Sequence, residues 1–187
     1  MSKYLVMFSG GLDSTGLLWH LLDSEQQVHV HHMIYLNRQS EDVAARRIVN
    51  WLHDTGYKFD YTESTIDVPR INGVPIRNMD CLNLIGGFLC SQMPDIQYIA
   101  VGMQAGDGRR PGWIERGATI LNAMTEGRVQ KVYPVIGKSR KELYESLPKP
   151  LKEMFWSCMA PGAKTPCGTC STCKELREAG VPHPERL

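Results

Sequence analysis

Two short stretches of this sequence combine residue types that could do chemistry. The first, Ser-Gly-Gly-Leu-Asp-Ser at residues 9–14, lies between two apolar runs. Glycines let the backbone approach a ligand closely, and the N-terminus of a helix offers unpaired N–H groups to an anion. Ser9, Ser14 and Thr15 would add hydroxyl donors. The stretch predicts an anion site at a strand-to-helix turn; a tight turn capped by Asp13 or Ser14 is the plainer alternative.

The anion loop lacks the residues of several familiar phosphate motifs. A Walker loop requires a Lys that this stretch does not contain. The dinucleotide fingerprint G-x-G-x-x-G and the nucleophile elbow G-x-S-x-G are also missing from it. These absences exclude a P-loop NTPase site, a dinucleotide site and a serine hydrolase elbow at this turn.

The second stretch is a cluster of cysteines in the last thirty residues. Its spacing is C-x8-C-x2-C-x2-C, formed by Cys158, Cys167, Cys170 and Cys173. Four thiolates suit a closed, tetrahedral, structural zinc site, which would also help to fold a tail with little apolar content. An iron–sulfur run would require a further C-x3-C-P, and Lys174 to Arg177 supply no such ligand. Disulfides would require an oxidising compartment, which nothing in the sequence indicates.

The other cysteines and the histidines of the first sixty residues are interpreted as structural. Apolar neighbours surround two cysteines, which we expect to be buried core thiols. Several histidines lie on a predicted strand or helix, where a place in the core or on the surface is expected before a ligand role. These residues are Cys81, Cys90, His20, His29, His31, His32 and His53.

Composition indicates one globular domain with a small appended module. The chain has 187 residues, of which 42% are hydrophobic and 22% charged, and its formal net charge is +1. That balance gives no electrostatic case for a nucleic-acid partner. No apolar stretch reaches the roughly 18–20 residues that span a bilayer, so no membrane partner is expected. Without a signal peptide, we expect a cytoplasmic protein.

Strand patterns alternate with helix patterns along the chain, which predicts an α/β fold with a parallel sheet of about five strands covered on both faces. Residues 1–150 are assigned to this domain and residues 151–187 to a C-terminal zinc module packed on it. Gly, Pro and charged residues at 103–113 predict a functional loop, and residues 139–142 form a capping box. The predicted strands are 3–8, 28–36, 58–65, 96–102 and 130–135; the predicted helices are 14–23, 40–56, 79–93 and 114–126.

The anion loop closely resembles the PP-loop, S-G-G-x-D-S, of the ATP-pyrophosphatase families. Combined with the tetra-Cys tail, it makes the chain similar to the 7-cyano-7-deazaguanine synthase family of the queuosine pathway. Further stretches match that family at motif level: VHVHHMIYLNRQ at 28–39, VPIRNMDCLNLIGGFLC at 74–90, IQYIAVG at 96–102 and YPVIGKSRKEL at 133–143. The resemblance implies a Rossmann-like fold of the adenine nucleotide alpha hydrolase type.

The activity that the resemblance implies is an ATP-dependent carbon–nitrogen ligation. The carboxylate of 7-carboxy-7-deazaguanine would attack the α-phosphate of ATP, releasing pyrophosphate, and ammonia would displace AMP to form the amide. A second adenylation would dehydrate the amide to the nitrile. Implied cofactors are ATP with Mg²⁺, and a structural Zn²⁺; implied partners are a small deazapurine acid, ammonia and a second copy of the chain.

The same resemblance assigns roles to residues of the loop. Ser9 and Ser14, with the glycines, would bind pyrophosphate oxygens, while Asp13 would hold Mg²⁺ or order the loop. Arg77 is a candidate phosphate clamp, although a solvated surface arginine fits the sequence equally well. The implied nucleotide-binding residues are Phe8, Ser9, Gly10, Gly11, Leu12, Asp13, Ser14, Thr15, Gly16, Leu17 and Leu18.

Three segments depart from the family pattern, namely 35–39, 75–78 and 103–113. In the last of them, Asp107, Arg109 and Trp113 could read a purine-like base, or could belong to a loop of solvated charges. These departures leave open a paralogue that adenylates another carboxylate or amide. A PP-loop enzyme that thiolates a tRNA base, and a nucleotide-binding module without turnover, are further alternatives.

Overall fold

A computed structural model describes residues 3–35, 39–66, 78–105 and 112–185. Its centre is a five-stranded sheet in the order β3-β2-β1-β4-β5, in which every neighbouring pair is parallel. The strands are β1 (Lys3–Phe8), β2 (Gln27–Tyr35), β3 (Asp60–Ile66), β4 (Ile96–Ala100) and β5 (Gln130–Val132). The predicted α/β fold with a parallel sheet is confirmed.

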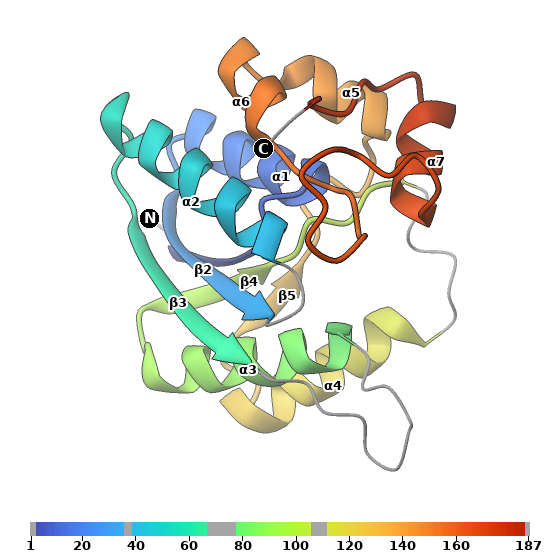
Figure 1. The fold of residues 1–187 in the computed structure, drawn as a ribbon. Helices are drawn as coiled ribbons and strands as arrows, with labels where there is room; N and C mark the ends of the chain where they lie inside the picture. The colour runs from blue at the N-terminus through green and yellow to red at the C-terminus, as the bar shows by residue number, and fades with distance from the viewer. Residues whose placement is uncertain (1–2, 36–38, 67–77, 106–111, 186–187) are drawn as a thin grey trace.

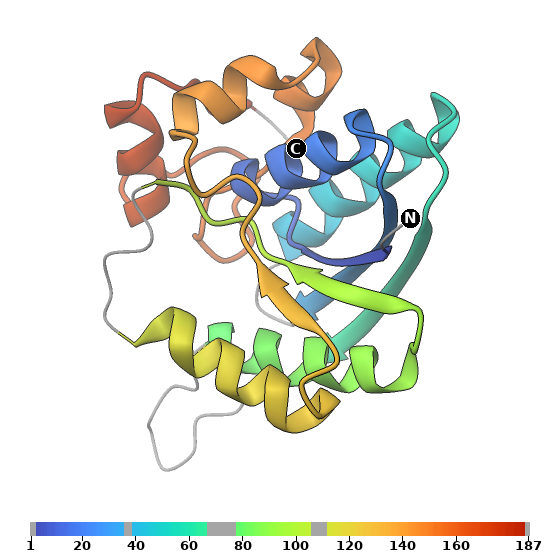
Figure 2. The ribbon, with the colours of Figure 1, turned by 180° about the vertical axis from the view of Figure 1, so that it is seen from behind.

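Helices cover both faces of the sheet (Figures 1 and 2). Four helices lie on one face: α1 (Leu12–Asp23), α2 (Gln39–Asp54), α5 (Arg140–Ser146) and α6 (Lys149–Met154). Two lie on the other: α3 (Asn78–Gln92) and α4 (Trp113–Thr125). The last helix, α7 (Ser171–Glu178), stands beside the carboxyl ends of the strands. The predicted elements are confirmed, with their ends shifted by a few residues; β5 is three residues shorter than expected.

Two apolar cores, one on each face of the sheet, fix the positions of the strands. Val6, Phe8 and Val30 pack against α1 and α2, whereas Leu5 and Met7 pack against α3 and α4. Because β1 is buried on both faces, its sequence is a continuous apolar run rather than an alternating one. The capping box at the start of α5 is confirmed: Ser139 accepts from the Glu142 N–H, and the Glu142 carboxylate accepts from the Ser139 N–H.

The strand order reverses between β1 and β4, which makes their carboxyl ends the expected ligand position of an open α/β sheet. The loop after β1 and the segment after β4 therefore leave the sheet side by side. Gly102 shows how close they lie, since a Cβ there would fall 2.8 Å from the backbone of Asp13 and Ser14. This approach brings the end of β4 against the first turn of α1.

The C-terminal segment packs onto the sheet domain instead of standing apart from it. Phe155, Leu176 and Val181 join the same core cluster as α1 and α2. The division of the chain at about residue 150 remains a prediction. Among the described residues, no helix is long and apolar enough to cross a membrane.

Candidate nucleotide pocket and metal centre

The predicted anion loop leads directly into α1 and is held by its own two serines. The Ser9 hydroxyl lies 3.0 Å from Ser14 Oγ, and the Ser14 hydroxyl donates to the Gly11 carbonyl at 3.1 Å. The Gly11 N–H donates in turn to Ser9 Oγ at 3.3 Å. Gly11 itself is the N-cap, without a side-chain cap, so neither Asp13 nor Ser14 is the plain helix cap of the alternative interpretation.

Gly10 is required by the path of the loop. Its backbone φ of +77° lies in the left-handed region, which residues other than glycine rarely adopt. A Cβ at this position would lie 2.7 Å from the Ala45 backbone nitrogen, so the loop passes directly over α2. Both observations explain the first glycine of the motif from the backbone alone.

The segment just before the first metal-ligand cysteine completes the loop from the other end of the chain. The Trp156 N–H donates to the Gly10 carbonyl at 2.9 Å, and Ser157 Oγ accepts from the Leu12 N–H at 3.0 Å. On its far side, the Ser157 N–H donates to His183 Nε2 at 3.1 Å. Sequence reasoning missed Ser157; its place immediately before Cys158 was the available signal.

A second residue missed by sequence reasoning is Arg140, which lies inside the capping box of α5. Its guanidinium is 3.5 Å from the Asp13 carboxylate and 2.5 Å from that of Glu175. Its side chain is only 13% exposed. A largely buried guanidinium therefore lies beside the anion loop, where it is a candidate for the phosphate-clamp role that sequence reasoning proposed for Arg77. Arg77 lies outside the described residues.

These residues line a pocket of about 290 Å³ at the carboxyl end of the sheet. The loop contributes Ser9, Gly11, Asp13 and Ser14, and a wall of other elements faces it. That volume is close to the lower end of the range for small-molecule sites. The facing wall includes Tyr35 from β2, Glu41 from α2, Met79 from α3, Gly102 after β4, Arg140 from α5 and Ser157 after α6.

Some of the predicted nucleotide-binding residues lie beneath the pocket rather than in its wall. The Leu17 and Leu18 side chains are fully buried in the core cluster, and that of Phe8 is nearly so. The Thr15 side chain is also buried, and its hydroxyl has no hydrogen-bond partner among the described residues. These side chains support the loop from below, and only the backbone near them could reach a ligand.

The residues predicted to read a base cannot be placed. Asp107 and Arg109 lie outside the described residues, as does the side chain of Trp113. The same holds for positions 36–38 and 67–77, which include most of the two other segments that depart from the family pattern.

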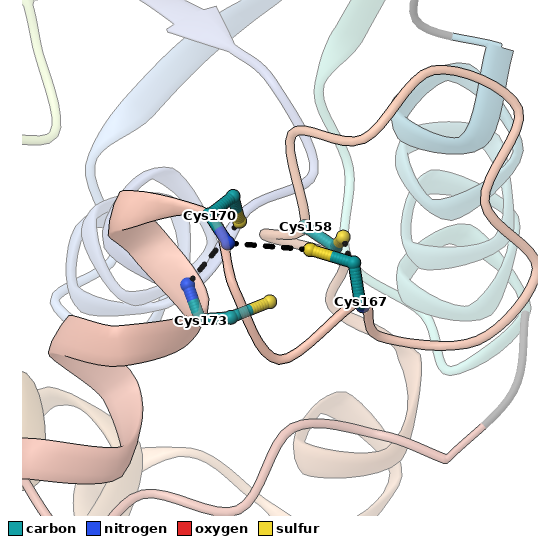
Figure 3. A group of neighbouring side chains, drawn as sticks. All are labelled: Cys158, Cys167, Cys170 and Cys173. Carbon is teal, nitrogen blue, oxygen red and sulfur yellow. Dashed lines mark hydrogen bonds between the residues drawn. The ribbon is translucent and has the colours of Figure 1, made fainter.

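The four predicted metal ligands come together at the base of α7 (Figure 3). Their sulfur atoms all lie within 4.8 Å of one another. Four bonds of about 2.3 Å to one tetrahedral zinc ion would separate the sulfurs by about 3.8 Å. The donor set and its spacing fit a single ion better than a cubane cluster, in which each thiolate binds a different iron. The cluster comprises Cys158, Cys167, Cys170 and Cys173.

Backbone N–H groups point at the thiols, as expected where sulfur carries negative charge. The Cys170 N–H donates to Cys167 Sγ at 3.3 Å, and the Cys173 N–H donates to Cys170 Sγ at 3.4 Å. The Cys170 N–H and the Thr169 hydroxyl lower the pKa of Cys167 to about 6. At Cys167 these donors favour the thiolate that metal binding requires, whereas burial raises the pKa of Cys158 and of Cys173 in the metal-free cluster.

The cysteines and β2 histidines that were interpreted as structural lie in the sheet layers. Cys90 is fully buried, and burial raises its pKa to about 11; Cys81 is half-buried in the same core. His32 bridges the Phe8 carbonyl oxygen at 2.8 Å and the Asp42 carboxylate at 2.9 Å. His29 and His31 bond to hydroxyl groups of β3.

Comparison with known sequences supports the motif-level resemblance over nearly the whole chain. No family model matches the chain. It is 25% identical to the 7-cyano-7-deazaguanine synthase of Aquifex aeolicus, covering 94% of each chain. It is 27% identical to that of Acetivibrio thermocellus, covering 97% of this chain and 96% of the relative. The predicted resemblance is confirmed: the chain is similar to these synthases, at low identity, over nearly its whole length.

Comparison with solved structures supports the fold. A predicted tRNA methyltransferase subunit from Methanocaldococcus jannaschii matches with a TM-score of 0.55 and 17% identity, covering 100% of this chain and 96% of that one. A 4-thiouridine synthetase solved with RNA and ATP matches with a TM-score of 0.56 and 16% identity, and the match covers 97% of this chain and 50% of that one. The U34-tRNA thiolase NcsA of Methanococcus maripaludis, which holds a [4Fe-4S] cluster, gives 0.53 and 13%, covering 95% and 64%.

Proposed function

We propose that this protein is an ATP-dependent enzyme that converts 7-carboxy-7-deazaguanine and ammonia into 7-cyano-7-deazaguanine. The observation that carries the proposal is the pocket at the reversal of strand order, walled by the Ser9–Ser14 loop, in a chain similar to such synthases over 94% or more of its length. The relatives' names supply the product, the motif-level resemblance implies the acid and ammonia, and the loop at a helix N-terminus favours a pyrophosphate group there.

In the first step, a carboxylate oxygen of the acid bonds to the α-phosphorus of ATP while the bond to the bridging oxygen breaks and pyrophosphate leaves. The glycine backbone and the N-terminus of α1 would hold the departing pyrophosphate, where partial positive charge opposes its developing negative charge. Arg140 lies close enough to the loop to share that charge. Ammonia then displaces AMP and loses a proton, giving the amide.

The second step follows the same geometry with the amide oxygen as the nucleophile. Adenylation turns that oxygen into a leaving group, and loss of AMP with two protons from nitrogen yields the nitrile. Mg²⁺, when bound with ATP, would neutralise phosphate charge. The carboxylates of Asp13 and Glu41 line the pocket and are the groups that would hold it.

We assign zinc to the four-cysteine centre, in a structural role. Four thiolates leave no open position for a substrate, so the ion would stabilise the fold of residues 156–173 and would not take part in the reaction. The bonds from Trp156 and Ser157 to the loop would then depend on this ion.

A tRNA thiolase is the second candidate, because one structural neighbour is a U34-tRNA thiolase and another is a 4-thiouridine synthetase solved with RNA. A thiolase that delivers sulfur through a nucleophilic cysteine needs that cysteine near the nucleotide. Cys90 is fully buried with a raised pKa, and neither it nor Cys81 lines the pocket. The remaining cysteines form the metal centre. These observations favour the ligase, as does a formal net charge of only +1.

The test is turnover by zinc-loaded protein supplied with ATP, Mg²⁺, ammonium and 7-carboxy-7-deazaguanine. We expect release of AMP and pyrophosphate that depends on the acid, with the nitrile detected by mass spectrometry. Arg140→Met should lower kcat/KM for ATP by about 100-fold, which is about 2.7 kcal/mol. The exposed Arg47→Met is the matched control. Folded, zinc-loaded protein that releases no acid-dependent pyrophosphate would refute the proposal.

A further inference from the structure

A second, much smaller pocket lies beside the nucleotide pocket and is lined by polar groups that the reaction above does not use. Its volume is about 10 Å³, enough for one water molecule or one polar group of a ligand. Met79 lines both pockets, so the small one opens next to the large one. Its polar groups come from α3, α4 and the end of β5.

The centre of this small pocket is the amine of Lys131, carried by β5 on the face that α3 and α4 cover. Lys131 Nζ donates to Asn83 Oδ1, and Asn83 is only 3% exposed. The fold leaves room for this pair: a Cβ at Gly117 of α4 would lie 2.4 Å from Lys131 Nζ and 3.0 Å from Asn83 Oδ1. The glycine in the second turn of α4 therefore leaves room for the amine in this position, and an alanine there would require the end of the Lys131 side chain to move.

Hydrogen-bond donors outnumber acceptors in the small pocket. An ammonium group has three N–H donors, and the described residues provide one acceptor for Lys131, the Asn83 oxygen. The Tyr133 hydroxyl is buried and has no hydrogen-bond partner among the described residues. The Asn83 amide nitrogen adds further donors. Buried donors without acceptors are costly, so this arrangement is complete only with an acceptor-rich group in the pocket.

Charge favours an anionic acceptor. Lys131 and Arg116 are cations and Asp80 is the one carboxylate among the pocket residues, so the lining carries a formal excess of one positive charge. Asp80 is itself engaged with Arg116, at 3.5 Å. A carboxylate oxygen accepts several hydrogen bonds and carries the matching charge, whereas an ammonium ion would meet two cations.

We propose that Lys131, Asn83 and Tyr133 form an oxyanion pocket that binds one carboxylate oxygen of the acceptor substrate beside the nucleotide. The identity of that acceptor rests on the function proposed above. With one oxygen held by Lys131 and Tyr133, the other is left to face the nucleotide pocket. Lys131 is thus a positioning residue for the acid, in a pocket that shares Met79 with the pocket of the phosphate-binding loop.

The pocket is tested first with acetate as a bare carboxylate and acetamide as its neutral control. Zinc-loaded protein carrying ¹³C-methyl methionine is titrated with each, and the methyl resonances of Met79 and Met103, which line the pocket, are followed. We expect saturable shifts with acetate and none with acetamide, while Met154 in α6 stays unchanged. Lys131→Leu should abolish the shifts, and Tyr133→Phe should weaken acetate binding three- to tenfold. The exposed Lys149→Leu should leave binding intact.

A merely structural lysine would not produce the expected pH dependence of acetate binding. Burial lowers the pKa of Lys131 to about 8, with Asp80 opposing the shift. Acetate binding should therefore be strongest below pH 8 and weaken above it as the amine loses its proton. Arg116 and Asp80 are the other charged residues of the pocket; burial and the nearby Glu115 raise the pKa of Tyr133, which keeps its hydroxyl protonated over that range. Absence of a saturable acetate shift, or equal shifts with acetamide, would overturn the proposal.

Turnover separates this proposal from the proposed function. If the protein acts on 7-carboxy-7-deazaguanine, Lys131→Leu should raise KM for the acid at least tenfold and change KM for ATP less than twofold. An unchanged KM for the acid overturns the oxyanion pocket and leaves the function standing. If the acid is not a substrate but acetate binds as described, the proposed function fails and the pocket stands for another carboxylate.

Discussion

The polar groups of the two neighbouring pockets differ in how many hydrogen bonds they make within the protein. At the nucleotide end, which is the large pocket around the Ser9–Ser14 loop, the loop's serines bond to one another, Ser157 accepts from the Leu12 N–H, and Arg140 lies between two carboxylates. At the acceptor end, which is the small pocket proposed to bind the acid, the Lys131 amine has one hydrogen-bond partner among the described residues and the Tyr133 hydroxyl has none.

The difference indicates which end is preorganised by the protein and which is completed by a ligand. Groups already bonded to the protein keep their positions when the nucleotide is absent, so the nucleotide end should tolerate few changes. The Lys131 amine and the Tyr133 hydroxyl have few or no hydrogen bonds to the described residues, so a ligand could complete their bonding. Changes there should alter the binding of the acid and leave the fold largely intact.

The largest effect is expected from breaking the metal centre, which supports the nucleotide end. Cys170→Ser, or removal of the ion with a chelator, should release residues 156–173 from the loop. We expect zinc to fall from about one per chain to near zero and ATP affinity to fall by at least about 100-fold. Metal analysis and calorimetric titration with ATP measure the two quantities.

Cys81→Ser is the matched control for the metal centre, since this thiol is half-buried and lies outside the cluster. It should keep the zinc and the ATP affinity. Full ATP binding by metal-free protein would show that the nucleotide end does not need the metal, and would remove the contrast between the two ends.

Next in size is the effect of a methyl group at Gly10. Gly10→Ala should lower the free energy of unfolding by about 3 kcal/mol, because backbone strain adds to a clash with α2. Gly162→Ala is the control: its φ of +64° carries similar strain, but its Cβ would meet nothing within 4 Å. Chemical denaturation should therefore show a loss of only about 1 kcal/mol in the free energy of unfolding for Gly162→Ala. Equal losses for the two variants would contradict the close approach of the loop to α2.

A smaller effect is expected from Ser157→Ala, which removes the hydroxyl that accepts from the Leu12 N–H. The cost should be about 1 kcal/mol of stability, as for other lost helix caps, with a fall of about fivefold in ATP affinity. Ser91→Ala removes an exposed hydroxyl that bonds only within its own helix, and should change neither quantity measurably. A Ser157→Ala protein that binds ATP normally would assign this serine to the fold alone.

The effect expected at the acceptor end appears only as a change of stability with pH. The pKa of Lys131 is about 8 in the folded protein and near 10.4 when unfolded, so the unfolded chain binds more protons between these values. The stability of the wild type relative to Lys131→Leu should thus rise as the pH increases from about 8 to 10. Thermal unfolding across this range checks the slope, with the exposed Lys149→Leu measured in parallel as the matched control.

Local motifs were predictable from the sequence because they are contiguous. The loop at residues 9–14 and the cysteine spacing of the tail each specify their chemistry within a few residues. The strand and helix patterns gave the fold class for a similar reason, since each element is a short periodic segment. Their ends were less predictable, because tertiary contacts decide where a helix such as α1 begins.

The rest of the site could not be predicted because its partners lie far apart in the chain. Arg140 meets Asp13, and Ser157 meets Leu12, only after the sheet and its helices have formed. Arg140 was hidden within a capping box that has its own structural explanation. Asn83 in an apolar helix was a weak signal for the small pocket, but only the fold identifies Lys131 as its partner.

The hydrogen bond between the Trp156 N–H and the Gly10 carbonyl has a consequence for the order of folding. During synthesis the glycine loop emerges before the cysteine segment, and the strands β2 to β5 lie between them, so the whole sheet must be made before this bond can form. The nucleotide site would therefore mature late, after the sheet has collapsed and the cysteines have captured their ion. Supply of metal to newly made chains, more than the speed of sheet formation, would then set how quickly active protein accumulates.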